Sequence, residues 1–194
     1  MIADWAGAQW VLNRAESLRR LALLGAVMVL SACVSKPTHL VDNYDFFAQG
    51  KLGIKAPQQQ FSGNFSWRQT GVEVELQLWG PLGQGRTVLQ GNPDYLVLRR
   101  GEEVVAQGVP EQVMEQHLGW SLPLSVVGAW LTGEPYTGFP VAQTCLATFC
   151  QLGWEIATSG AVAEGSPIPR RIKAEREGYR VTLVTRRYTE KSTF

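Results

Sequence analysis

Apolar and polar residues alternate along two neighbouring segments of the chain, 61–67 and 72–78, and this alternation constrains the fold more than any other feature. The residues that would share one face of these segments are Phe61, Gly63, Phe65, Trp67, Val72, Val74, Leu76 and Leu78. Serine, asparagine, glutamate and glutamine occupy the positions between them. A period of two is typical of a strand with one buried face. The two segments therefore predict a hairpin with its turn at residues 69–71.

Similar patterns recur along the rest of the chain. Further strands are predicted at residues 48–55, 86–90, 95–100, 154–158, 171–176 and 179–187. Turn-forming residues separate most of them, notably Gly91-Asn92-Pro93-Asp94 and Gly178. Short strands at such regular spacing indicate an antiparallel meander that curls into a sandwich or a barrel.

The middle of the chain has the pattern of two helices. Pro110 can begin a helix that ends at Gly119, and Pro123 can begin a second that ends at Gly133. The second helix is apolar almost all round, so it must be covered on every side or face an apolar ligand. Large apolar side chains from such a helix and from a curved sheet can fill a solid core or line a cavity, and the residue pattern leaves both open.

The N-terminal segment has the layout of an export signal, predicted here as residues 1–32. Basic residues precede an apolar run at 21–30, which is well short of the roughly twenty residues that a transmembrane helix needs. Leu30-Ser31-Ala32-Cys33 resembles the lipobox of bacterial lipoproteins, in which the cysteine is acylated and becomes the new N-terminus. A chance tetrapeptide is the alternative, and the start codon can lie nearer Leu18 than Met1.

Acylated Cys33 would be the first residue of the mature protein and its membrane anchor. Val34 follows it, whereas an aspartate at this position favours retention in the inner membrane, so we expect the outer membrane. Residues 33–43 have little periodic hydrophobicity and are predicted to be the lipidated N-terminus and a tether. Residues 44–194 have a suitable length and an even composition for a single domain.

The charge balance argues against nucleic acid as a partner. The predicted leader holds three of the eighteen basic and two of the seventeen acidic residues, which leaves fifteen of each in the mature chain. A domain without excess positive charge is poorly suited to binding phosphates. One basic stretch, residues 170–191, could face anionic lipid or an acidic partner, or it could be the solvated face of two strands.

The residues that usually carry catalysis or bind metal form no motif. His39 and His117 are the only histidines, and neither accompanies a pattern typical of a serine or cysteine nucleophile. Cys145 and Cys150 lack the second pair of ligands that a zinc site needs. In an oxidising compartment the two cysteines can form a disulfide or remain free. We therefore expect no enzyme activity, no metal and no cofactor.

Several short motifs, in order, resemble those of the outer-membrane lipoprotein receptor family LolB. They are Phe65-Ser66-Trp67 with Arg68-Gln69-Thr70-Gly71, Leu78-Trp79-Gly80-Pro81-Leu82-Gly83, Leu122-Pro123-Leu124, Trp130-Leu131-Thr132-Gly133 and Pro169-Arg170-Arg171-Ile172. The similarity extends over residues 47–188. Cys145, Cys150 and the long leader depart from the family pattern.

The resemblance implies a mainly β fold, a half-open antiparallel β-barrel with a short helical lid over a hydrophobic cavity for acyl chains. On this basis the cavity residues would be Phe61, Phe65, Trp67, Leu76, Leu78, Leu89, Leu96, Leu98, Trp120, Leu122 and Trp130. It also implies a protruding turn of Pro81, Leu82 and Gly83, in which Leu82 aids insertion into the membrane.

The function that the resemblance implies is transfer of acylated lipoproteins. The protein would accept its cargo from the soluble periplasmic carrier LolA and insert it into the inner leaflet of the outer membrane. We expect it to act as a monomer that faces the periplasm and contacts outer-membrane lipid. The alternative is a structural or assembly-scaffold lipoprotein with a solid core, which would bind no acyl chains.

Overall fold

The computed structural model describes residues 44–190 of the chain. The predicted signal peptide, the anchor Cys33 and the tether at residues 33–43 lie outside the described residues. The elements that the structure describes are, in chain order, β1 (Phe46–Lys55), β2 (Gln60–Thr70), β3 (Glu73–Trp79), β4 (Thr87–Gly91), β5 (Leu96–Arg100), β6 (Glu103–Gly108), α2 (Pro110–Leu118), α3 (Leu124–Thr132), β7 (Phe149–Gln151), β8 (Trp154–Ala161), β9 (Pro169–Arg176) and β10 (Tyr179–Glu190).

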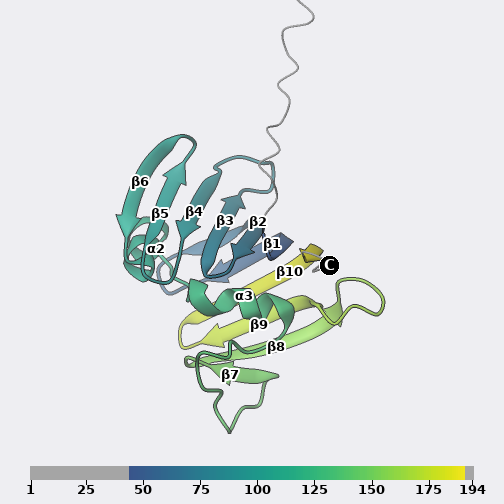
Figure 1. Ribbon diagram of the computed structural model, residues 1–194. Coiled ribbons are helices and arrows are strands. Elements are labelled where there is room, and N and C mark those ends of the chain that lie inside the picture. The colour runs from purple at the N-terminus through teal and green to yellow at the C-terminus, as the bar shows by residue number, and fades with distance from the viewer. Residues whose placement is uncertain (1–43, 191–194) are drawn as a thin grey trace, which may run out of the picture. The chain divides into compact units, whose positions relative to one another are not determined.

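The ten strands form one antiparallel sheet in the order β6-β5-β4-β3-β2-β1-β10-β9-β8-β7. Strands β1 and β10, the first and last of the chain, pair next to the centre of the sheet. The outermost strands β6 and β7 do not pair with each other, so the sheet stays open. Figure 1 shows the sheet curling around α2 and α3, which connect its two edges. The expected mainly β fold, a half-open barrel with a short helical lid, is confirmed.

Alternation explains which side chains face the helices. In β2 and β3 the predicted inner residues Phe65, Trp67, Leu76 and Leu78 are buried, each no more than 2% exposed. The register places Phe65 opposite Leu78 and Trp67 opposite Leu76. Directly opposed side chains on one sheet face stabilise a strand pair, and here they build a continuous apolar surface across the hairpin.

Both predicted helices are present, with the expected glycine at the C-terminal end of each. Gly119 ends α2 with a φ of 73°, and Gly133 ends α3 with a φ of 90°. Glycine suits this left-handed conformation because it has no Cβ. In α3 the buried residues are Leu124, Val126, Val127, Gly128, Trp130 and Leu131. A helix that is apolar on most sides is thus covered on most sides, as its sequence requires.

Three details differ from the sequence prediction. Val72 was predicted to face the interior, but the hairpin turn lies at Gly71 and Val72, and this valine is 61% exposed. Strands β6 and β7 were not predicted. Strand β6 has no buried residue on either face, and β7 is only three residues long, so neither gives a clear period of two.

Candidate functional site

The inner face of the sheet and the two helices enclose one continuous apolar cluster. Ten of the eleven predicted cavity residues belong to it, each no more than 3% exposed: Phe65, Trp67, Leu76, Leu78, Leu89, Leu96, Leu98, Trp120, Leu122 and Trp130. Phe61 is half-buried and packs against the same cluster, with its ring 6.4 Å from that of Trp120. The structure therefore brings all eleven residues together.

The sequence prediction missed the other half of this interior. Its further members include Leu52, Ile54, Val113, Met114, Val126, Val127, Leu131, Trp154, Ile156, Ile172, Ala174, Val181 and Leu183. Strand β10 has the clearest sequence pattern from which some of these residues could have been predicted, because Val181 and Leu183 alternate with Arg180 and Thr182. The inner wall thus extends across β8, β9 and β10 beneath α3.

Polar contacts at the protein surface hold α2 to the sheet. The Tyr179 hydroxyl on β10 donates a hydrogen bond of 3.3 Å to the Glu115 carboxylate on α2. The Arg100 guanidinium on β5 donates one of 3.2 Å to the backbone carbonyl of His117. Exposed hydrogen bonds contribute little net stability because water competes for both partners. These contacts at the rim of α2 can open at low cost, whereas the buried Val113 and Met114 of the same helix pack on the apolar cluster.

Aromatic and cationic side chains close the interior beside Tyr179. The Arg176 guanidinium lies 4.6 Å from the centre of the Trp154 ring and 5.3 Å from that of Tyr179. Burial and the Glu115 charge both raise the pKa of Tyr179 above its ordinary value. The tyrosine therefore stays protonated at neutral pH and remains a donor to Glu115.

One buried polar side chain, Gln151 on β7, fixes the segment that follows α3. Its amide oxygen accepts hydrogen bonds from the Trp130 indole nitrogen, at 3.2 Å, and from the backbone nitrogen of Tyr136, at 3.1 Å. Its amide nitrogen donates to the backbone carbonyls of Tyr136 and Phe139, at 2.7 and 3.0 Å. A single side chain thus joins α3, the loop after it and the edge strand β7.

The turn between β3 and β4 presents a leucine to solvent. Leu82 is 92% exposed, whereas Gly83 and Gly85 beside it have positive φ angles of 87° and 65°. Gln84 closes the turn, because its side-chain oxygen accepts the Leu82 amide hydrogen at 3.0 Å and its backbone carbonyl accepts that of Gly80 at 2.8 Å. The leucine is held outward by this network and cannot fold back cheaply onto the sheet.

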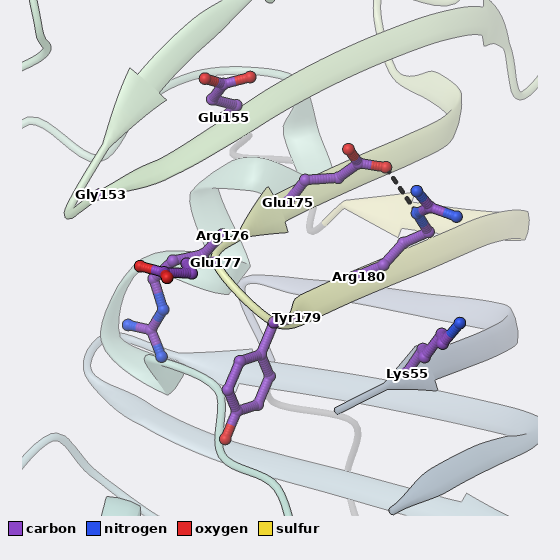
Figure 2. A pocket seen from close by; sticks show the side chains of 9 residues that line it. Lys55, Gly153, Glu155, Glu175, Arg176, Glu177, Tyr179 and Arg180 are labelled. Carbon is purple, nitrogen blue, oxygen red and sulfur yellow. Dashed lines mark hydrogen bonds and ion pairs between the residues drawn. The ribbon is translucent and has the colours of Figure 1, made fainter. Parts of the chain in front are cut away.

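A separate pocket of about 510 Å³ lies at the turns that join β7 to β8 and β9 to β10 (Figure 2). Strand register aligns Lys55, Arg180, Glu175 and Glu155 in one row across four strands. Arg180 and Glu175 form an ion pair of 2.7 Å within this row. Three cationic and three anionic side chains line the pocket, so charged residues make up most of its lining.

The remaining residues singled out in the sequence lie at the surface or near the sheet edge. The basic residues of β9 and β10 are all exposed, which matches the solvated face of two strands. Cys145 and Cys150 form a disulfide with their Cα atoms 5.7 Å apart. His117 is exposed in the last turn of α2.

Within residues 44–190, no group of three His, Cys, Asp or Glu side chains could hold a metal ion. The same residues include no helix long and apolar enough to cross a membrane.

Tyr188 on β10 gives a prediction for alkaline pH. Burial and the Glu190 charge raise its pKa from the ordinary 10.0 to about 12, and its ring stacks on Phe46 at 5.6 Å. The folded state therefore binds this proton more tightly than the unfolded state does. Its contribution to stability is fully present below pH 10 and is lost as the pH rises towards 12. We expect the urea midpoint to fall more steeply over this range in the native chain than in Tyr188→Phe. Parallel curves for the two proteins would contradict the assignment.

An open antiparallel sheet with an apolar inner face and a lid of two short helices defines a class of protein that binds an apolar ligand between sheet and lid. The chain belongs to the family described as outer membrane lipoprotein LolB, whose model matches residues 44–187. It is a lipoprotein of the outer membrane on the periplasmic side.

Curated relatives carry the same name, "Outer-membrane lipoprotein LolB". The protein from Nitrosococcus oceani is 35% identical over 148 residues, which are 72% of this chain and 74% of that protein. The protein from Stutzerimonas stutzeri is 36% identical over 146 residues, 70% of this chain and 69% of its own. The protein from a Marinomonas species is 28% identical over 190 residues, 88% and 97% of the two chains.

Proposed function

We propose that the chain is the receiving protein for lipoprotein cargo, which it takes from the soluble carrier LolA and inserts into the inner leaflet of the outer membrane. The apolar interior carries this proposal, because it extends over both halves of the sheet and beneath both helices. Family membership supports it, since the members are lipoprotein-localisation factors. We infer that the protein acts as a monomer and catalyses no reaction.

Acyl chains would enter between the sheet and the lid. Helix α2 is fastened to the sheet by exposed hydrogen bonds from Tyr179 and Arg100, and the two sheet edges are not joined. Each methylene moved from water into the interior contributes about 0.8 kcal/mol. Burial of several acyl chains therefore outweighs the loss of a few surface contacts on α2. Aromatic walls such as Phe65, Trp67 and Trp120 would bind chains without selecting a particular protein cargo.

The remaining features have roles in anchoring and release. We infer that residues 1–32 are removed, that acylated Cys33 tethers the protein through residues 33–43, and that residues 44–194 form the single binding domain. Leu82 would dip into the bilayer and bring the lid close to the lipid. No nucleotide is needed if cargo is bound more tightly by this receptor than by the carrier, and more tightly still by the membrane.

A binding titration tests the proposal against a scaffold lipoprotein with a solid core. The whole chain with Cys33→Ala would be titrated with a fluorescent triacylated lipopeptide, and with the same peptide without acyl chains as the control. We expect saturable binding of the acylated form only, because apolar burial supplies nearly all of the affinity. Equal binding of both forms, or of neither, would favour the scaffold.

A second measurement tests the direction in which the lipoprotein cargo is transferred. Purified LolA loaded with a labelled lipoprotein would be mixed with the Cys33→Ala chain, and the label would be followed by size-exclusion chromatography. We expect the cargo to move to the receptor without added nucleotide. Cargo that stays on LolA although the lipopeptide binds would assign the chain a lipid-binding role outside this transfer step.

A further inference from the structure

Basic side chains form a belt on the outer face of the sheet, the face opposite the apolar cluster. Strand register aligns the outer residues of this region in three neighbouring rows. Among the described residues of these three rows, none is acidic. The basic residues that lie in the rows or directly beside them are all exposed, and we call them the basic belt: Lys51, Arg86, Arg99, Arg171, Lys173 and Arg187.

One of the three rows ends at the base of the turn that presents Leu82. This row leads from Arg171 on β9 through Lys51 on β1 to Trp79, the last residue of β3. Arg86 immediately precedes β4, and its guanidinium lies 5.6 Å from the centre of the Trp79 ring. The basic belt is therefore continuous with the turn of Leu82.

The basic belt is a local excess of positive charge, because the whole chain has a formal net charge of only +1. The outer rows on either side of it contain acidic residues. Glu75 pairs with Arg68 at 2.8 Å on one side, and Glu175 pairs with Arg180 at 2.7 Å on the other. Opposite charges offset each other in these flanking rows. The belt keeps a single sign, so it attracts a negatively charged surface within about a Debye length, about 8–10 Å in moderate salt.

The length of the turn places Trp79 and Arg86 at the level of lipid headgroups. Leu82 is three residues beyond Trp79, and three residues span at most about 11 Å. The headgroup layer on each side of the hydrocarbon is about 5–8 Å thick. When Leu82 reaches the hydrocarbon, the side chains at the base of the turn are therefore within the headgroups or next to them. Indole rings are enriched at this level, and cationic side chains bind anionic lipids there.

We propose that the basic belt, through Arg86 and Lys51, binds the phosphate groups of anionic phospholipids and holds the Leu82 turn on the membrane. This inference rests on the membrane contact of Leu82 in the proposed function. The leucine enters the hydrocarbon, whereas the belt contacts the headgroups. An acidic protein surface would also attract the belt, but a membrane accounts in addition for the exposed leucine and the half-buried Trp79 beside it.

Binding to lipid vesicles tests this proposal. The Cys33→Ala chain would be mixed with vesicles of phosphatidylcholine alone, or of equal parts phosphatidylcholine and phosphatidylglycerol, and the bound fraction would be measured by flotation. We expect the parent to bind the anionic vesicles about tenfold more tightly or better, since several basic residues contribute. This preference should disappear in about 1 M salt, where the Debye length is only about 3 Å.

Substitutions locate the contact. Arg86→Gln and Lys51→Gln should each weaken binding to anionic vesicles about fivefold, the equivalent of about 1 kcal/mol for one basic side chain near an anionic surface. Binding to neutral vesicles should not change. Lys55→Gln is the matched control, because it makes the same change on the same face of β1, but in the row that also contains Glu175 and Glu155 (Figure 2). That row has as many acidic as basic residues, so the control should weaken binding less than about twofold.

The outcomes separate this proposal from the proposed function. If Arg86→Gln and Lys51→Gln bind anionic vesicles as tightly as Lys55→Gln does, or if the parent shows no preference for them, the basic belt is not a lipid contact. If the two variants keep full vesicle binding but receive cargo from LolA more slowly, the belt docks the carrier, and the proposal is overturned. The lipopeptide titration is independent of all these results. Its failure would refute the receptor function, whatever the vesicles show.

Discussion

Leu82→Glu is expected to leave folding and lipopeptide binding unchanged while slowing the insertion of cargo into vesicles about tenfold or more. The side chain is 92% exposed, so its replacement removes almost no buried contact. In the middle of a membrane-spanning helix, an acidic side chain raises the free energy of insertion by about 2.5–3.5 kcal/mol, whereas an apolar side chain changes it by close to zero. At a shallower depth in the bilayer the Leu82→Glu side chain would cost less than this. A cost of about 1.4 kcal/mol is already equivalent to a tenfold change.

The chain offers a matched control in Leu146→Glu. Leu146 is also fully exposed, but it lies in the short loop that the Cys145–Cys150 disulfide closes. The two variants carry the same change in charge and the same loss of one exposed leucine. Insertion would be followed as the rate at which a labelled lipoprotein moves from the receptor into phospholipid vesicles. We expect only the Leu82 variant to be slow, and Leu82→Met to behave like the native chain.

Two other outcomes would change the role of Leu82. If Leu82→Glu blocks the receipt of cargo from LolA, then this leucine docks the carrier. If Leu82→Glu and Leu146→Glu slow insertion equally, then the added negative charge slows insertion wherever it lies on the surface. The turn that carries Leu82 would then have no specific role in insertion. Gln84 forms its hydrogen bonds with the backbone of Leu82 and Gly80, so we expect the turn to keep its shape when the Leu82 side chain is replaced.

The sequence predicted the parts of the fold that depend on local pattern. Alternation in residues 61–78 identified Phe65, Trp67, Leu76 and Leu78 as inner residues, because a strand with one buried face repeats every two residues. Glycines after α2 and α3 marked the helix ends, since their left-handed conformation is a local property. Val72 was misplaced because the turn extends one residue further along the chain than the pattern indicates.

Features that depend on distant partners were beyond the sequence. Gln151 lies in a segment with ordinary loop composition, and only the fold brings it to Trp130, 21 positions earlier. The position of Gly50 opposite Thr185 likewise follows from a register shift between the first and last strands of the chain. Part of the interior was missed for the same reason, because β9 comes to lie against α3 only after the sheet has curled.

Gln151→Leu is expected to be the most destabilising of the substitutions considered, by about 3 kcal/mol. Leucine has a similar volume, so the loss comes from polar groups left without partners rather than from a cavity. The groups affected are the Trp130 indole nitrogen, the amide and carbonyl of Tyr136, and the carbonyl of Phe139. Each buried unpaired group costs about 1–3 kcal/mol, and access of water to the loop offsets part of the total.

Thermal unfolding measures this effect, with Gln90→Leu as the control. Gln90 is an exposed glutamine on β4, so the control makes the same chemical change away from the buried network. For a domain of this size a loss of about 3 kcal/mol lowers Tm by about 6–12 °C. The lipopeptide affinity should fall as well, because Trp130 positions α3 over the inner wall. If Gln151→Leu were as stable as Gln90→Leu, the loop after α3 would keep its conformation without the hydrogen bonds of Gln151. The position of α3 would then not depend on β7.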